Sequence, residues 1–165
     1  MPSHSRRPDA GFTGSKAEVS MFRDKSLTVR LTYLGALPFW LALLAVFAGL
    51  PVDGALRVFL GYGAVIAAFM AGTIWTAAHW SERQSVLLLA MSSIIALIVF
   101  AVIAVPARTS VAMLVQVACL LALFGLDCAI HRNGDQPKWY IVMRARVTAI
   151  VLAAYAGMAA ATGQF

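Results

Sequence analysis

The sequence predicts an all-α integral membrane protein, a bundle of five transmembrane helices. Hydrophobic residues make up 61% of its 165 residues and the mean hydropathy is +0.82, whereas soluble domains are about 45–50% apolar. Charged residues are only 12% of the chain, and they divide it into five apolar runs. Each run comes near the roughly 20 residues that a helix needs to cross the hydrocarbon layer of a bilayer.

The chain divides into a tail and a helical domain. Residues 1–30 are polar, contain Pro, Gly and Ser, and lack a periodic apolar face, so we expect a disordered, basic, cytoplasmic tail there. Residues 31–165 are expected to form the transmembrane domain. Its helices are predicted over about residues 31–50, 56–78, 85–105, 109–130 and 139–162.

The basic residues predict how the chain lies in the membrane. With a cytoplasmic N-terminus and five crossings, eleven of the 13 Lys and Arg residues lie on the cytoplasmic side, and only Arg57 and Arg108 lie on the other side. Cytoplasmic loops of membrane proteins carry such an excess of positive charge. We therefore expect the N-terminus in the cytoplasm and the C-terminus outside. This topology accounts for the net charge of +6, so we expect no nucleic-acid partner.

Polar or helix-bending residues inside the predicted helices are few. Pro38 is expected to bend the first helix near Leu34 and to hold this part against protein, because the carbonyl that loses its helical donor needs a partner there. Gln116 is expected to hydrogen-bond across a helix interface. Cys119 and Cys128 lie about 13 Å apart by helix rise, which is too far for a disulfide, and both are interpreted as buried small apolar residues.

The stretch between the last two apolar runs, residues 127–146, concentrates charge and aromatic side chains. Asp127 lies roughly one turn inside one helix and Arg144 roughly one turn inside the next, on the same side of the membrane. Because a lone charge in a membrane helix is costly, we expect these two side chains to form an ion pair.

Aromatic and basic residues around this pair form a predicted cluster on the cytoplasmic side. An aromatic belt, positive-inside residues and one ion pair explain the cluster as a structural feature. Alternatively, its aromatic side chains could stack on a ligand while its arginines hold an anionic group. The members of the cluster are Trp75, His79, Trp80, Asp127, His131, Trp139, Arg144 and Arg146.

Small residues recur every four positions in two of the predicted helices. Such strips let two backbones approach closely, so we expect the strips on the second and fifth helices to contact each other. They comprise Ala64, Ala68, Gly72 and Thr76 in the second helix and Ala149, Ala153, Gly157 and Ala161 in the fifth.

The residue types favour a function without catalysis. The sequence has no nucleophile with a matching base, no paired carboxylates within the bundle and no metal-ligand spacing, so we expect no enzyme, no metal site and no cofactor. We expect an accessory or scaffold component whose partners are the lipid bilayer and either another membrane protein or a second copy of the chain. The alternative is a binder of a lipid, quinone or tetrapyrrole at the cytoplasmic side of the bundle. A small-solute transporter is the third choice, because the centres of the helices carry no charge.

An ordered set of residues resembles a known family. It runs from Gly35-Ala36-Leu37-Pro38-Phe39-Trp40 through Tyr62-Gly63, Phe69, Gly72 and Trp75 to Asp127, Pro137, Trp139-Tyr140, Arg144 and Thr148. Together these residues resemble the family called domain of unknown function 3429, over about residues 31–152. The resemblance implies a small multi-pass protein of the bacterial inner (plasma) membrane, and in that membrane the orientation expected from the basic residues places the C-terminus in the periplasm. By this resemblance the family comprises small bacterial membrane proteins and relatives of an animal mitochondrial transmembrane protein. The resemblance identifies no catalytic residues.

Overall fold

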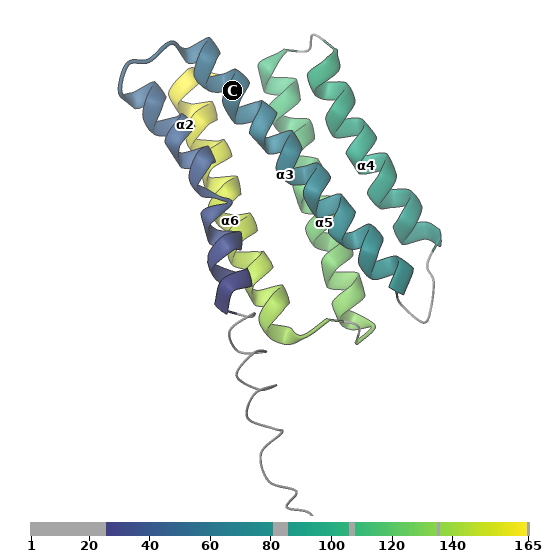
Figure 1. Cartoon of the computed structure of the whole chain (residues 1–165). Helices are drawn as coiled ribbons and strands as arrows, with labels where there is room; N and C mark the ends of the chain where they lie inside the picture. The colour runs from purple at the N-terminus through teal and green to yellow at the C-terminus, as the bar shows by residue number, and fades with distance from the viewer. Residues whose placement is uncertain (1–25, 81–85, 106–107, 135, 165) are drawn as a thin grey trace, which may run out of the picture.

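Five long helices packed side by side make up the computed structural model (Figure 1), which describes residues 26–80, 86–105, 108–134 and 136–164. Within these ranges five helices are long and apolar enough to cross a membrane, and no residue is in a strand. The predicted all-α, five-helix membrane bundle is therefore confirmed. The first span covers Ser26–Phe47, and the labelled helices are α2 (Leu37–Phe47), α3 (Val52–Trp80), α4 (Val86–Ala104), α5 (Thr109–Arg132) and α6 (Lys138–Thr162).

The predicted helix bounds agree with the structure to within a few residues, except at the start of the first span. That helix begins at Ser26, so the prediction that residues 26–30 belong to a disordered tail is wrong. The predicted apolar run starts only after Arg30, because charged residues were taken as the limits of each run. Arg30 is exposed, however, and an exposed arginine can extend its charged end to the membrane surface while its helix continues. The expectation of disorder for residues 1–25 lies outside the described residues.

The first span is interrupted at Gly35 and Ala36, as Pro38 predicted. The chain makes a turn at these two residues, and α2 starts with Pro38 in its first turn. The hydroxyl of Tyr62 on α3 donates a hydrogen bond of 2.8 Å to the carbonyl of Gly35. Because α3 supplies this donor, the bend lies against protein, and Ala36 is only 3% exposed.

Four of the helices form a closed ring, and one lies outside it (Figure 1). α2 contacts α3 and α6, and α5 contacts α6 and α3, so each of the four touches two neighbours in the ring. α4 packs against α3 and α5 from the outside. The first span begins at the lower end of Figure 1 and α6 ends at the upper end, as an odd number of crossings requires.

The upper part of the ring is filled by aromatic rings around a buried glutamine. Phe39 packs edge-on against Phe59 with ring centroids 5.2 Å apart, and Tyr155 packs against Phe59 at 4.7 Å. Gln116, fully buried, donates to the carbonyl of Leu60 at 2.8 Å and accepts a hydrogen bond of 2.5 Å from the Tyr155 hydroxyl. The predicted hydrogen bond of Gln116 across a helix interface is thus confirmed, and it links α5 to α3 and α6.

The predicted contact between the two small-residue strips is wrong. The main neighbours of α3 are α2, α4 and α5, and those of α6 are α2 and α5. Only Ala64 of the first strip is buried, and Gly157 and Ala161 of the second are partly buried. The other five strip residues face outward on their helices: Ala68, Gly72, Thr76, Ala149 and Ala153. Helices that are apolar on every side do not reveal from a small-residue repeat which face meets a neighbour.

The close helix approaches occur at two other positions on the ring. A Cβ at Gly63 of α3 would lie 2.6 Å from Gln116 Oε1 and would also meet the Tyr155 hydroxyl. A Cβ at Gly157 of α6 would lie 2.9 Å from Leu43 of α2. These glycines therefore determine how closely α3 approaches α5 and α6, and how closely α6 approaches α2.

We expect Gly63→Ala to destabilise the bundle and Gly72→Ala to leave its stability nearly unchanged. The added methyl at position 63 overlaps Gln116, and overpacking of this kind costs about 1–3 kcal/mol. Apart from the backbone of α3 itself, no atom of the described residues lies within 4 Å of a Cβ at position 72. Thermal unfolding of both variants in the same mild detergent tests the difference. An equally large loss at position 72 would show that the strip on α3 carries the close contact after all.

Candidate functional site

The lower part of the ring contains an ion pair between α5 and α6. Nε of Arg144 donates to Oδ2 of Asp127 at 2.8 Å, and the two residues are 7% and 1% exposed. Arg144 lies six residues after the start of α6, or about 9 Å along the helix, and Asp127 lies about 7–8 Å before the end of α5. The predicted ion pair is confirmed, and both charges lie inside the bundle at similar depth.

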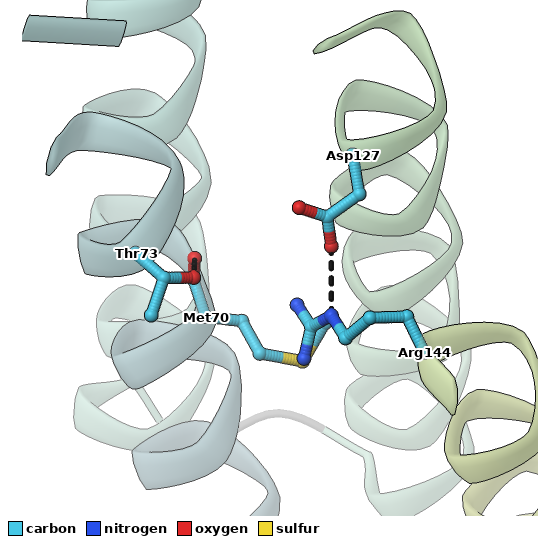
Figure 2. A network of polar contacts seen from close by, with 4 residues as sticks. All are labelled: Met70, Thr73, Asp127 and Arg144. Atoms are coloured by element: carbon cyan, nitrogen blue, oxygen red, sulfur yellow. Dashed lines mark hydrogen bonds and ion pairs between the residues drawn. The ribbon is translucent and has the colours of Figure 1, made fainter. Parts of the chain in front are cut away.

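The two charged groups meet through one hydrogen bond instead of two. A guanidinium can hold a carboxylate by two parallel N–H···O bonds, but Oδ1 of Asp127 and Nη2 of Arg144 are both buried without a hydrogen-bond partner among the described residues. Figure 2 shows the arginine side chain reaching from α6 toward Met70 and Thr73 on α3. The ring of Tyr140, one turn earlier on α6, flanks the guanidinium, whose Cζ lies 5.9 Å from the ring centroid.

A cavity of about 370 Å³ adjoins the ion pair, between the first span and helices α3, α5 and α6. Its wall is mostly apolar, and among the described residues that line it Arg144 is the one with a charge. The polar lining residues are Thr28, Thr32, Thr73, Tyr140, Arg144 and Thr148. Apolar lining residues include Leu31, Ile66, Phe69, Leu120, Val147 and Val151.

The cavity opens on the side of the bundle. Leu31 on the first span and Phe69 on α3 both line it and are 58% and 69% exposed. In a membrane-spanning bundle such a rim of large apolar side chains faces hydrocarbon. A molecule dissolved in the bilayer can therefore reach the cavity sideways, without crossing an aqueous surface.

Two of the hydroxyls that line the cavity use their hydrogens within their own helices. Thr32 donates to the carbonyl of Thr28 at 2.8 Å, and Thr73 donates to the carbonyl of Met70 at 2.7 Å. These hydroxyls are therefore not free to donate to a ligand. Arg144, whose Nη2 has no hydrogen-bond partner within the described ranges, supplies a charged donor at the cavity wall.

The predicted cluster of eight residues does not form a single site. Trp75 and His79 stack on each other with ring centroids 5.4 Å apart, on an exposed face of α3. His131 bonds through Nδ1 to the carbonyl of Gln136 at 2.7 Å.

Two further members of the cluster, Trp139 and Arg146, do not line the cavity. Trp139 packs edge-on against Tyr140 with ring centroids 6.0 Å apart, and Arg146 is exposed. The side chain of Trp80 lies outside the described residues. The structure thus brings together Asp127 and Arg144, and no histidine or tryptophan side chain that the structure describes lines the cavity.

Sequence reasoning did not identify the other lining residues. Tyr140, Arg144 and Thr148 recur every four residues and so share one face of α6. That spacing, read outward from the predicted ion pair, could have located this wall of the cavity. The threonines supplied by the first span, Thr28 and Thr32, carry no comparable signal, because Thr28 lies in the segment that was predicted as a tail.

The described residues contain no group of three or more His, Cys, Asp or Glu side chains that could hold a metal ion. Cys119 and Cys128 are both free thiols. Cys119 is buried as expected, whereas Cys128 is half-buried.

We expect the ion pair to show strong coupling in a double-mutant cycle. Asp127→Asn leaves a buried guanidinium without its counter-charge, and removing one partner of a buried pair costs about 3–5 kcal/mol. The double variant Asp127→Asn, Arg144→Gln removes both charges, so its loss of stability should be smaller than that of Asp127→Asn alone. Thermal unfolding in detergent measures all four corners of the cycle.

The control is Arg146→Gln, which removes an exposed arginine two residues along the same helix. Its effect should stay within about 0.5 kcal/mol. Losses that simply add in the double variant would contradict the coupling.

Comparison with known proteins identifies the family. No curated protein and no solved structure matches the chain. The family model described as protein of unknown function (DUF3429) matches residues 25–160. This match confirms the resemblance seen in the sequence, and it starts next to the observed beginning of the first helix at Ser26. The chain is a multi-pass membrane protein that belongs to the DUF3429 family.

Proposed function

We propose that this chain is an accessory membrane protein, without catalytic activity of its own, that binds a membrane-soluble amphiphile in the cavity beside Arg144. The observation that carries the proposal is the cavity itself, which is largely apolar, is lined by the buried cationic residue Arg144 and opens between Leu31 and Phe69. Ligand pockets in proteins typically combine a mostly apolar wall with a few polar groups that orient the ligand. The volume of about 370 Å³ lies at the small end of the range for such pockets, about 300–1,000 Å³.

The geometry favours this function over solute transport. A transporter usually places titratable or polar groups near the bilayer centre, free to meet the solute. Gln116, the strongly polar side chain in the middle of α5, already bonds to Leu60 and Tyr155 and is fully buried. These bonds support a structural role for Gln116.

The geometry also narrows the class of ligand. A haem would need an axial ligand, and of the histidines in the described part of the chain, His79 stacks on an outward face while His131 bonds to its own loop. Neither lines the cavity. We therefore favour a lipid-like molecule over a tetrapyrrole.

We propose a bacterial inner membrane as the location, with the N-terminal end in the cytoplasm and the C-terminal end in the periplasm. Support comes from the basic residues at the lower end of the bundle, where the first span begins and α5 meets α6: Arg30, Arg132, Lys138, Arg144 and Arg146. Arg57 and Arg108 lie near the starts of α3 and α5, at the other end. An excess of positive charge on one side is typical of the cytoplasmic side.

We expect a bulky residue in the cavity to reduce the amount of lipid that the protein retains. Val147→Phe on α6 fills part of the cavity, so lipid retained through purification in mild detergent should fall several-fold. Val142→Phe adds the same ring to the same helix at a position that is 48% exposed and does not line the cavity, so it should retain as much as the unmodified protein. Native mass spectrometry counts the bound molecules. Equal retention in both variants would rule out the cavity as the binding site.

The orientation predicts opposite results for reporters at the two ends. A periplasm-specific enzyme reporter should be active after fusion at the C-terminus and inactive at the N-terminus. A reporter that is fluorescent only in the cytoplasm should show the reverse. If both ends report the same compartment, the five-crossing orientation is wrong.

A further inference from the structure

We infer that the amphiphile carries an anionic head group, a carboxylate or a phosphate, and that the guanidinium of Arg144 binds this group while the chain lies along the apolar wall. This inference rests on the proposed function and names the chemical class of its ligand. It assigns Arg144 a second task beyond its ion pair with Asp127.

The hydrogen-bonding capacity of Arg144 is only partly used. A guanidinium has five N–H donors, and Asp127 takes the one on Nε. Nη2 is buried and has no partner among the described residues, although Arg144 is only 7% exposed. A buried, charged donor without an acceptor is costly, and a rotation of the guanidinium toward the adjoining cavity would let an oxygen of a ligand supply the acceptor.

The Arg144 side chain extends between α6 and α3 at the cavity wall. Arg144 reaches from α6 toward Met70 and Thr73 of α3 (Figure 2), and all three residues line the cavity. Asp127 does not line it. Asp127 is therefore a positioning residue, because it holds Nε of Arg144 from α5 while Arg144 itself lines the cavity.

The surroundings favour an anion over a neutral acceptor. Arg30, Arg132, Lys138 and Arg146 are all exposed at this end of the bundle, and Asp127 is the one acidic residue there within the described ranges. Exposed basic residues beside a membrane attract anionic lipid head groups. Charge-assisted hydrogen bonds from a guanidinium to a carboxylate or phosphate are also about twice as strong as bonds between neutral groups.

The cavity also accounts for the apolar part of the ligand. Leu31 and Phe69 form its rim, and Ile66 and Val147 line it farther along the helices. A head group at Arg144 therefore leaves a chain free to run along these side chains toward the opening. The cavity suits a single acyl chain with one charged end.

The experiment compares single-chain ligands that differ in head group. Native mass spectrometry of the full chain in a non-ionic detergent gives apparent affinities for oleate, oleoyl lysophosphatidic acid and neutral monooleoylglycerol, with inorganic phosphate as a probe without a chain. We expect at least one anionic amphiphile to bind about tenfold more tightly than monooleoylglycerol, as one charge-assisted hydrogen bond implies. Preference for oleate identifies a carboxylate ligand, and preference for the lysophosphatidic acid identifies a phosphate.

Two variants separate this role from a purely structural one. The double variant Asp127→Asn, Arg144→Gln, which carries no unpaired buried charge, should lose the preference for anions and still bind monooleoylglycerol. Asp127→Asn alone should increase the preference several-fold below its unfolding temperature, because its guanidinium is no longer neutralised. Arg146→Gln is the matched control for general surface charge and should keep the preference of the unmodified protein.

Each remaining outcome overturns a defined part of the inference. Equal affinity for neutral and anionic amphiphiles, unchanged in the Asp127→Asn variant, refutes the anionic head group but leaves the proposed function intact. Inorganic phosphate binding as tightly as the lysophosphatidic acid refutes the role of the chain. If none of the amphiphiles binds, the proposed function itself fails.

Discussion

Every polar group inside the ring of helices must find a partner within the protein, since hydrocarbon provides none. Three neighbouring pairs are linked in this way. Tyr62 joins α3 to the bend that precedes α2, Gln116 joins α5 to α3, and Tyr155 and Arg144 both join α6 to α5. These bonds specify which helices are neighbours, a choice that apolar packing alone leaves open because each helix is apolar on most of its surface.

The outer position of α4 is consistent with the same need of polar groups for partners within the protein. Ser92 and Ser93 both donate to the carbonyl of Leu89 on their own helix, so the polar groups of α4 need nothing from another helix. Ser92, Ile95 and Val99 are its buried residues, and they face α3 and α5. α4 is therefore held by van der Waals packing of one face, and the rest of its surface is available to lipid.

At the candidate site, not every buried polar group finds a hydrogen-bond partner. Gln116 satisfies both ends of its amide, whereas Asp127 and Arg144 share one bond and leave Oδ1 and Nη2 without partners in the described part of the chain. The cavity lies on the arginine side of this pair. A donor that the bundle leaves unused, beside an apolar space open to the bilayer, connects the packing of the helices to the proposed function.

What the sequence determined by itself is the depth of each residue along the membrane normal. Run lengths and charges predicted five crossings, and the equal distance of Asp127 and Arg144 from a short loop predicted their ion pair. Gln116 and Pro38 were correctly expected to need partners inside the protein. In each case the argument depended on position along a helix, which hydropathy and helix rise specify directly.

What only the tertiary structure decided is the rotation of each helix about its axis. Ala68, Gly72 and Thr76 were expected at a helix contact and face outward, while Gly63 makes the close approach. Trp75 and His79 share the depth of the ion pair but point away from it, and the cavity draws residues from four separate spans. A helix that is apolar on all sides has no hydrophobic stripe to show which face is inside, so rotation is settled by packing and hydrogen bonds between helices distant in sequence.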